Sequence, residues 1–357
     1  MKMIEPSVEV IREPDMAKRI EIAARCCYKS EDKITDGSAI KMVQALIKRG
    51  HESPLEHSNI VVATYTPLAT NALQKMITTY EYETGVPAYI RNFGSYNESL
   101  NFASPIWSGN LRAWRSLAKR FRGDSLFQVL FMRHPLFQDV FYDSEEDLHY
   151  GFKGHGLSYS GAKMDAFEMY HESPLEENDL LVAGILNPTD TNGVNNLEEI
   201  YPRIVAFEDL ESMNADMHQI LTVRIIADRG VQNELVRHRL LSPSVESTRY
   251  CNYGGGLTCI EPWWYPDASE AETAAFTSIM QDSESDYDYM QNNIKSPAPQ
   301  KSRAVLPLAT KSEGVYTGTV DYWKKHIIPL RKSAAAHPDM RRVMEMLCKE
   351  MGWTEFE

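Results

Sequence analysis

Residues 219–241 constrain the fold most strongly, because two different hydrophobic periods follow each other there. Apolar and β-branched residues alternate through 219–226, which predicts a strand. Asp228-Arg229-Gly230 is expected to form a turn, and 231–241 has helical spacing. A strand followed so closely by a helix favours helices packed on a sheet. Further helices are predicted at 15–27, from Asp36 or Ser38 to Gly50, at 271–293 and from Pro338 to Met351, and a further strand at 59–66.

The 357 residues are enough for one large domain or two ordinary ones. Lys and Arg total 37 against 50 Asp and Glu, a formal net charge of −13, which argues against broad binding to nucleic acid or anionic membranes. No apolar window approaches the roughly 20 residues of a membrane span, and the first ten residues contain no apolar signal region. The five cysteines lack paired C-x-x-C spacing, so we expect neither a zinc ribbon nor a disulfide framework, and a cytoplasmic location.

Cations are concentrated in one segment, RHRLLSPSVESTRYCNY at 237–253. It contains Arg237, His238, Arg239 and Arg249, and guanidinium groups offer paired donors that suit phosphate and carboxylate. The Ser/Pro stretch after the helical period is expected to break the helix, so that basic side chains and free backbone N–H groups share a pocket. The alternative is a solvated basic helix face paired with the surplus acids. We favour an anion site.

Two short motifs recur in the chain. HESPLE stands at 51–56 and again at 171–176, and SGNLRAWR at 108–115 resembles TGTVDYWK at 317–324. The separations, 120 and 209 residues, share no period, which excludes a solenoid. A partial duplication and chance both remain open as explanations.

The basic segment also carries a more specific pattern. R-H-R, then Ser three residues on, then E-S-T-R-Y resembles the signature of the flavin-dependent thymidylate synthase family. The resemblance implies an α+β fold with a mixed or antiparallel sheet flanked by helices. It implies one catalytic domain over 1–357, with a core of about 1–66 and 206–357 and a large insertion at 67–205. Other blocks that resemble the family are AARCCYKSEDKITDGSA (23–39), RGHESPLEH (49–57), SRAVLPLATKSE (302–313) and LRKSAAAHPDMR (330–341).

The resemblance implies reductive methylation of dUMP to dTMP by a homotetramer, with FAD as cofactor, NADPH as reductant and methylenetetrahydrofolate as carbon donor. Methylation at C5 of uracil needs charge delocalised on the ring oxygens, which a fixed arginine stabilises. Arg331 matches the family's arginine for that role and is the expected catalytic residue. The resemblance implies dUMP binding by Glu234, Arg237, Glu246, Ser247, Arg249, Arg303 and Arg331. It implies FAD binding by Ser53, Glu56, Arg237, His238 and Arg239.

HESPLEH, at 51–57, could also suggest a metal site, because histidine and carboxylate are ordinary ligands. Pro54 interrupts the helix that would place such ligands on one face, and the motif is not the H-E-x-x-H of zinc proteases. We therefore expect a structural or flavin-lining role for this motif and no metal. Cys251 is expected to be a small buried side chain rather than a nucleophile.

The sequence departs from the family pattern in three places. Val245 stands where the family usually has Gln or Glu, and Thr319-Val320-Asp321 stands where an N-x-R element commonly contacts FAD. About 140 residues separate the two predicted strands, where short members have a turn. The inserted region contains Asn110-Leu111-Arg112-Ala113-Trp114, so we hypothesise that Asn110 and Arg112 replace the lost FAD contacts. The alternative is that Asn110 simply caps a helix.

Two other functions compete with thymidylate synthesis. A related flavin-dependent enzyme, such as a pyrimidine-nucleotide hydroxymethylase, would keep the fold and change the product. A non-catalytic nucleotide-binding subunit would have lost FAD altogether. The resemblance favours thymidylate synthesis, and the other two functions are the alternatives to it.

Overall fold

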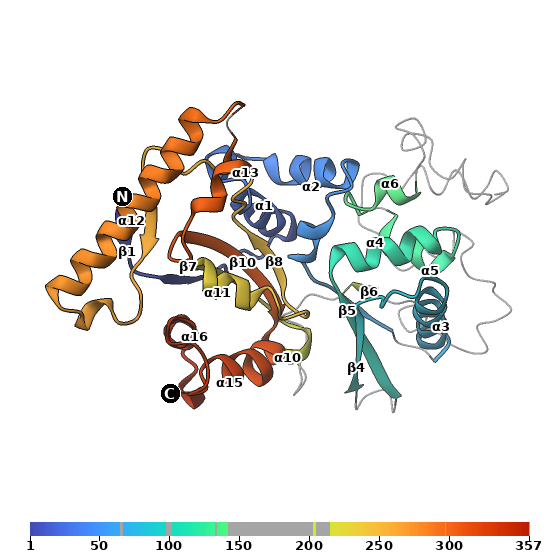
Figure 1. The fold of residues 1–357 in the computed structure, drawn as a ribbon. Coiled ribbons are helices and arrows are strands. Elements are labelled where there is room, and N and C mark those ends of the chain that lie inside the picture. The colour runs from blue at the N-terminus through green and yellow to red at the C-terminus, as the bar shows by residue number, and fades with distance from the viewer. Residues whose placement is uncertain are drawn as a thin grey trace, which may run out of the picture. The chain divides into compact units, whose positions relative to one another are not determined.

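A computed structural model describes residues 1–64, 67–97, 102–132, 134–141, 203–204, 215–296 and 298–356 (Figure 1). The chain forms two compact units: unit 1, Met1–Ser58 with Gln219–Glu357, and unit 2, Asn59–His218. Both units combine helices with antiparallel strands, which confirms the predicted α+β class. The second HESPLE motif lies outside the described residues.

Unit 1 is built on a four-stranded antiparallel sheet in the order β2-β7-β10-β8. The strands are β2 (Ser7–Val10), β7 (Ile220–Asp228), β10 (Lys311–Thr319) and β8 (Ser242–Val245). β7 confirms the strand predicted at 219–226. A separate parallel pair joins β1 (Lys2–Ile4) to β9 (Thr258–Ile260).

Helices cover both faces of this sheet. Successive side chains of a strand point to opposite faces, and on β10 Val315 packs with Ala23 and Cys26 of α1 (Met16–Cys26). Its neighbour Tyr316 belongs to the opposite core, with α11 (Arg229–Leu235) and α16 (Pro338–Met351). β10 is therefore buried on both faces, and Figure 1 shows α1 and α16 on opposite sides of it.

The predicted helices of unit 1 are largely confirmed, and their ends follow local signals. The Asp15 side chain accepts from the Lys18 N–H at the start of α1, and α2 spans Ser38–Lys48. A Ser269–Glu272 capping box begins α12 (Glu270–Asn293). The remaining elements are η1 (Glu31–Lys33), η2 (Ser53–Glu56), η6 (Tyr265–Asp267), α13 (Pro299–Ser302), η7 (Arg303–Val305), α14 (Val320–Tyr322), a π-helical turn (Trp323–Ile327), α15 (Ile328–Arg331) and η9 (Thr354–Phe356).

Two local predictions around the basic segment were wrong. No turn separates β7 from α11, because the Asp228 side chain accepts from the Val231 N–H at 2.9 Å and starts the helix directly. The helix predicted to reach 241 ends at Leu235. The Ser/Pro stretch then forms β8, where Pro243 is tolerated because β8 is an edge strand.

Unit 2 has its own four-stranded antiparallel sheet in the order β4-β5-β3-β6. Its strands are β3 (Ile60–Ala63), β4 (Ile90–Asn97), β5 (Phe102–Gly109) and β6 (Arg203–Ile204), and its helices are α3 (Pro67–Thr84), α4 (Leu111–Arg120), α5 (Ser125–Phe131), α6 (Gln138–Phe141) and α10 (Ala215–His218). β3, predicted as a core strand before the insertion, pairs with β5 and β6. The division into a core and an insertion at 67–205 stays a prediction. None of the described helices is long and apolar enough to cross a lipid bilayer.

Candidate active site

Arg331, the expected catalytic residue, lies at the end of α15 and is held by two other predicted site residues. Its Nε donates to His238 Nε2 at 2.8 Å, and its Nη1 donates to Glu234 Oε2 at 2.6 Å. Nη2 also donates to the Glu234 carbonyl oxygen at 3.3 Å. Both edges of the guanidinium are thereby occupied, so Arg331 has a fixed orientation as well as a fixed charge.

His238 is neutral in this cluster. Burial and the neighbouring Arg331 charge both lower its pKa. Because Nε2 accepts the hydrogen bond from Arg331, the ring proton is assigned to Nδ1. His238 is therefore a hydrogen-bond acceptor that orients Arg331, and it is not an additional cation.

Arg237 and Arg239 flank His238 on the exposed turn after α11. Neither has an ion-pair partner among the residues that the structure describes. Two exposed arginines thus stand on either side of the histidine that orients Arg331, and exposed guanidinium groups are suited to bind anions. The structure thus brings together four of the predicted residues from 234–239 with Arg331.

A second group of predicted residues lies on the turn that follows β8. The Ser247 N–H donates to the Cys27 carbonyl oxygen at 3.0 Å, which fixes this turn on the end of α1. Arg249 is exposed, with its guanidinium 5.4 Å from the centre of the Tyr250 ring. Arg303 Nη1 lies 3.5 Å from Thr248 Oγ1, so Arg249 and Arg303 belong to the same surface of unit 1.

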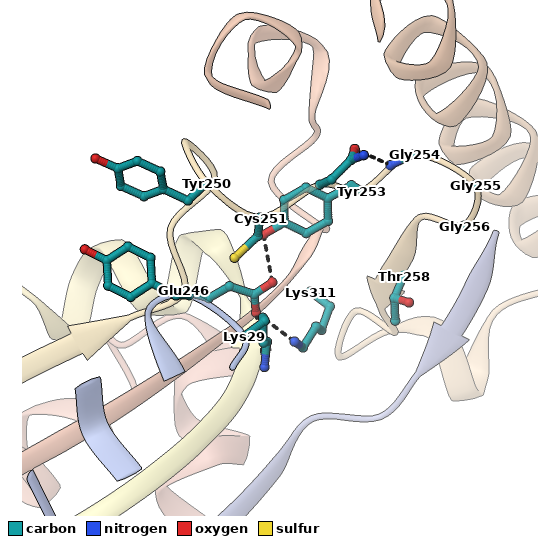
Figure 2. A pocket seen from close by; sticks show the side chains of 12 residues that line it. Lys29, Glu246, Tyr250, Cys251, Tyr253, Gly254, Gly255, Gly256, Thr258 and Lys311 are labelled. Carbon is teal, nitrogen blue, oxygen red and sulfur yellow. Dashed lines mark hydrogen bonds and ion pairs between the residues drawn. The ribbon is translucent and has the colours of Figure 1, made fainter. Parts of the chain in front are cut away.

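Glu246 points inward, into a buried ion network. Its carboxylate accepts from Tyr253 Oη at 2.8 Å and from Lys311 Nζ at 2.7 Å, with Lys29 Nζ at 3.7 Å (Figure 2). Lys29 also pairs closely with Glu313. Burial alone would raise the pKa of Glu313, but the hydrogen bond and charge of Lys29, with Lys311, lower it overall. Glu313 is therefore ionised, and both carboxylates are paired with lysines.

This network forms the floor of a pocket of about 440 Å³. Its remaining lining comes from the 250–256 loop, including Cys251 and three consecutive glycines, and from Tyr28 and Thr258 (Figure 2). Burial raises the pKa of the Cys251 thiol, as does the nearby Glu246 charge. Cys251 is thus a buried thiol, as predicted, and not an activated nucleophile.

The HESPLEH motif is anchored by His57. His57 Nδ1 lies 2.8 Å from Thr317 Oγ1 and its Nε2 lies 2.8 Å from Ser244 Oγ, which fastens the end of η2 to β10 and β8. Complete burial, and secondly the charge of Arg19, lower the pKa of His57 to about 3, so its ring is neutral. Among the described residues no histidine of this motif joins a group of metal-ligating side chains.

The two predicted flavin residues of this motif differ in their surroundings. Glu56 Oε2 accepts from Ser242 Oγ at 3.2 Å, whereas Ser53 is exposed. Asn110 and Arg112 belong to unit 2, where the Asn110 side chain accepts from the Ala113 N–H at 2.8 Å and Arg112 is exposed. Asn110 therefore caps α4; flavin contacts by Asn110 and Arg112 stay predictions.

Sequence reasoning missed Lys29, Tyr253, Lys311 and Glu313. A signal was present for the last two, because charged residues at positions i and i+2 share one face of a strand that is otherwise apolar or small. Two charges on one face of a buried strand need partners, and the partners are Lys29 and Glu246. The pairing joins residues 284 positions apart, so no local pattern could identify it.

These features define an α+β protein in which Arg237, Arg239 and Arg331 lie at or just after the ends of α11 and α15. The family model of the thymidylate synthase complementing protein matches residues 9–73 and 214–352, together more than half of the chain. The chain belongs to this family.

Two curated relatives are the flavin-dependent thymidylate synthases of Mycobacterium marinum and Mycobacterium tuberculosis, each 31% identical over 126 residues. These residues make up 32% of this chain and 50% of each relative, so the chain spans about half the length of the relatives it matches. Among solved structures, a UMP/dUMP methylase, PolB from Streptomyces cacaoi bound with 5-Br dUMP, aligns with a TM-score of 0.32 and 22% identity. It covers 40% of this chain and 69% of PolB, a similarity too low to support an argument.

Proposed function

We propose that this protein is a flavin-dependent thymidylate synthase that converts dUMP to dTMP. Methylenetetrahydrofolate would supply the one-carbon unit, and NADPH would supply the reducing equivalents through FAD. Family membership and the curated relatives support the class of reaction. The observation that carries the proposal is Arg331, oriented by Glu234 and His238 beside two exposed arginines.

The donor set fits an anionic flavin nucleotide. Arg237 and Arg239 present free guanidinium edges, which suit phosphate oxygens, while Glu56 and Ser53 lie on the HESPLEH segment of the same unit. When bound, FAD supplies the hydride that the protein's own side chains cannot supply. The protein's part is to bind and orient the ligands and to neutralise their charges.

Arg331 would act on the uracil ring of dUMP. Negative charge delocalised on the ring oxygens of the N3-ionised uracil, the form in which C5 is nucleophilic, would be stabilised by a guanidinium whose direction is already set. Glu234 and His238 would be positioning residues for Arg331, while Ser247, Arg249 and Arg303 would bind the phosphate and sugar. Glu246, by contrast, is a buried member of the network with Lys311, so its contribution would be to hold the turn at 246–249 in place.

We also propose that Arg112 contributes to FAD binding and that the enzyme works as a homotetramer. Arg112 is exposed two residues after the Asn110 cap, at the start of α4. Arg112→Ala should weaken FAD retention, with Lys119→Ala, at an exposed position in the last turn of the same helix, as control. Unchanged FAD affinity in the first variant would remove Arg112 from the site.

The visible spectrum of the purified protein with added FAD tests the proposal. The expected result is a bound flavin whose absorption bands shift when dUMP is added, and a loss of binding in Arg239→Gln. A colourless protein that takes up no FAD would instead support the nucleotide-binding subunit. The mass of the product separates methylation from hydroxymethylation.

A further inference from the structure

The two units contain the same arrangement of three strands and two helices. In unit 1 the sheet strands and their helices follow in the order β7–α11–β8–β10–α14, with β9, η6, α12, α13 and η7 inserted between β8 and β10, and in unit 2 the order is β3–α3–β4–β5–α4. In each unit the third of these strands lies between the first and the second, and all neighbours are antiparallel. A fourth antiparallel strand, β2 or β6, pairs with the outer side of the first. The two sheets therefore share strand order and direction, and differ in the long connection between β8 and β10.

A buried tryptophan occupies the same place in both. Trp323 follows β10 and donates its indole N–H to the Leu221 carbonyl oxygen at 3.3 Å, and Trp114 follows β5 and donates to the Ile60 carbonyl oxygen at 3.0 Å. Both indoles are fully buried. Both accepting carbonyls lie on the first strand, opposite a glycine: Leu221 pairs with Gly318 and Ile60 pairs with Gly109.

The helix that carries each tryptophan begins in the same way. The Thr319 hydroxyl accepts from the Tyr322 N–H, and the Asn110 side chain accepts from the Ala113 N–H. The recurring sequences SGNLRAWR and TGTVDYWK are thus the same structural element. This match favours duplication over chance as the origin of the two sequences.

A buried histidine gives a second matched contact. His57 Nδ1 lies 2.8 Å from Thr317 Oγ1 of β10, and His218 Nδ1 lies 2.9 Å from Ser108 Oγ of β5. Each histidine stands three residues before the carbonyl that accepts from the tryptophan. The residue numbers of the two histidines differ by 161, as do those of Ile60 and Leu221, so the spacing is conserved between the copies.

The chain exchanges segments between the copies at these histidines. Residues up to Ser58 precede β3 in the chain, yet they belong to unit 1, where β2 pairs with β7. Residues up to His218 precede β7, yet they belong to unit 2, where β6 pairs with β3. The unit boundary falls one residue after His57 and directly after His218, at nearly equivalent positions.

The copies differ where ligand binding is expected. A shift of 161 places Met76, Ile77 and Thr78 of α3 opposite Arg237, His238 and Arg239. Met76 and Ile77 are buried apolar side chains, so α3 offers no cationic turn there. In unit 1, β8 ends at Val245 and the chain leaves the sheet to form the Glu246–Arg249 turn. The matching strand of unit 2, β4, instead continues to pair with β5 as far as Asn97.

We propose that unit 2 is a second copy of the fold of unit 1 that binds no nucleotide by itself, so that each chain carries one dUMP site and one FAD site. The ligand part of this proposal rests on the proposed function. The duplication itself rests on the matched topology and hydrogen bonds. Residues 1–58, which precede the second copy in the chain, complete the sheet of unit 1 through β2.

Ligand stoichiometry tests the absence of a second site. Calorimetric titration of the FAD-loaded protein with dUMP should give one dUMP per chain, and absorbance should give one flavin per chain. Arg249→Gln, at an exposed residue of the expected dUMP set, should abolish nearly all dUMP binding, while Thr78→Ala, on the segment of unit 2 matched to Arg237–Arg239, should leave it unchanged. Two dUMP per chain, or a binding capacity only halved by Arg249→Gln, would overturn the proposal.

Exchange of the indole protons tests the duplication without any ligand. In protein labelled with ¹⁵N-tryptophan, the indole N–H of Trp114 and Trp323 should exchange with solvent far more slowly than that of the half-exposed Trp263. Trp→Phe variants assign the signals. If Trp114 exchanges as fast as Trp263, the second copy does not exist as described. If both are protected but dUMP does not bind, the duplication stands and the proposed function fails.

Discussion

The buried His57 gives a prediction about stability against pH that can be worked through quantitatively. In the folded chain its pKa is lowered from 6.5 to about 3, since the ring is fully buried between Thr317 and Ser244. In the unfolded chain the ring would take up a proton below about pH 6.5. The unfolded state then binds more protons than the folded state, so the free energy of unfolding falls as pH falls through this range.

The slope follows from the linkage relation. One excess proton bound in the unfolded state lowers the free energy of unfolding by about 1.4 kcal/mol for each pH unit of acidification. Protonation of His57 in the unfolded chain should therefore lower the free energy of unfolding by about 1 kcal/mol between about pH 7 and about pH 5.5. The variant His57→Gln keeps an amide that can face both hydroxyls but cannot titrate. It should lower stability at all pH values while losing this part of the pH dependence.

Urea unfolding followed by circular dichroism at several pH values measures the effect. The comparison is between the slopes of wild type and variant, because the carboxylates of unit 1 contribute to both curves alike. The control is His51→Gln, in the same motif but exposed, whose slope should equal that of the wild type. Equal slopes for the wild type and His57→Gln would refute the assignment of a buried neutral ring.

Three further substitutions test the site and its support. Arg331→Lys keeps a charge but loses the fork to Glu234 and His238, so we expect kcat to fall roughly 100-fold with dUMP still bound; an unchanged kcat would remove Arg331 from the chemistry. Glu246→Gln leaves Lys311 and Lys29 short of negative charge and should cost about 2–3 kcal/mol in urea unfolding; a neutral result would mean that the network is solvated. Gly314→Ala would place a methyl group 2.6 Å from Gln232 Oε1 and from the Tyr316 ring, so we expect a loss of about 1–3 kcal/mol, whereas Gly256→Ala, with open space around it, should be near neutral.

Much of the fold of unit 1 could be predicted, because its elements depend on local signals. The alternation in β7, the Asp15 cap of α1 and the Pro338 start of α16 each lie within a few residues of the structure they specify. The shortened α11 could not be predicted, since residues 236–241 have acceptable helical spacing. There the edge of β10 is available for pairing, and tertiary pairing overrides the local preference.

The site residues likewise include some that the sequence could identify and some whose roles depend on tertiary contacts. The resemblance identified Glu234, His238 and Arg331, and the structure supplied the reason that they act together, which is the double hydrogen bonding of one guanidinium. The resemblance implies nucleotide binding by Glu246, whose carboxylate faces inward and accepts from Lys311. The direction of the Glu246 side chain depends on its ion pairs with Lys29, which lies just after α1, and with Lys311, on β10. No local sequence pattern identifies these partners, because the contacts form only when the chain folds.

Turnover of dUMP tests the central claim most directly. The FAD-loaded protein is incubated with dUMP, methylenetetrahydrofolate and NADPH, and the nucleotide product is identified by its mass, with Arg331→Lys as the matched control. We predict dTMP, formed with oxidation of one NADPH per product and formed far more slowly by the variant. A hydroxymethylated nucleotide, or unchanged dUMP in the presence of bound flavin, would contradict the assignment of this protein as a thymidylate synthase.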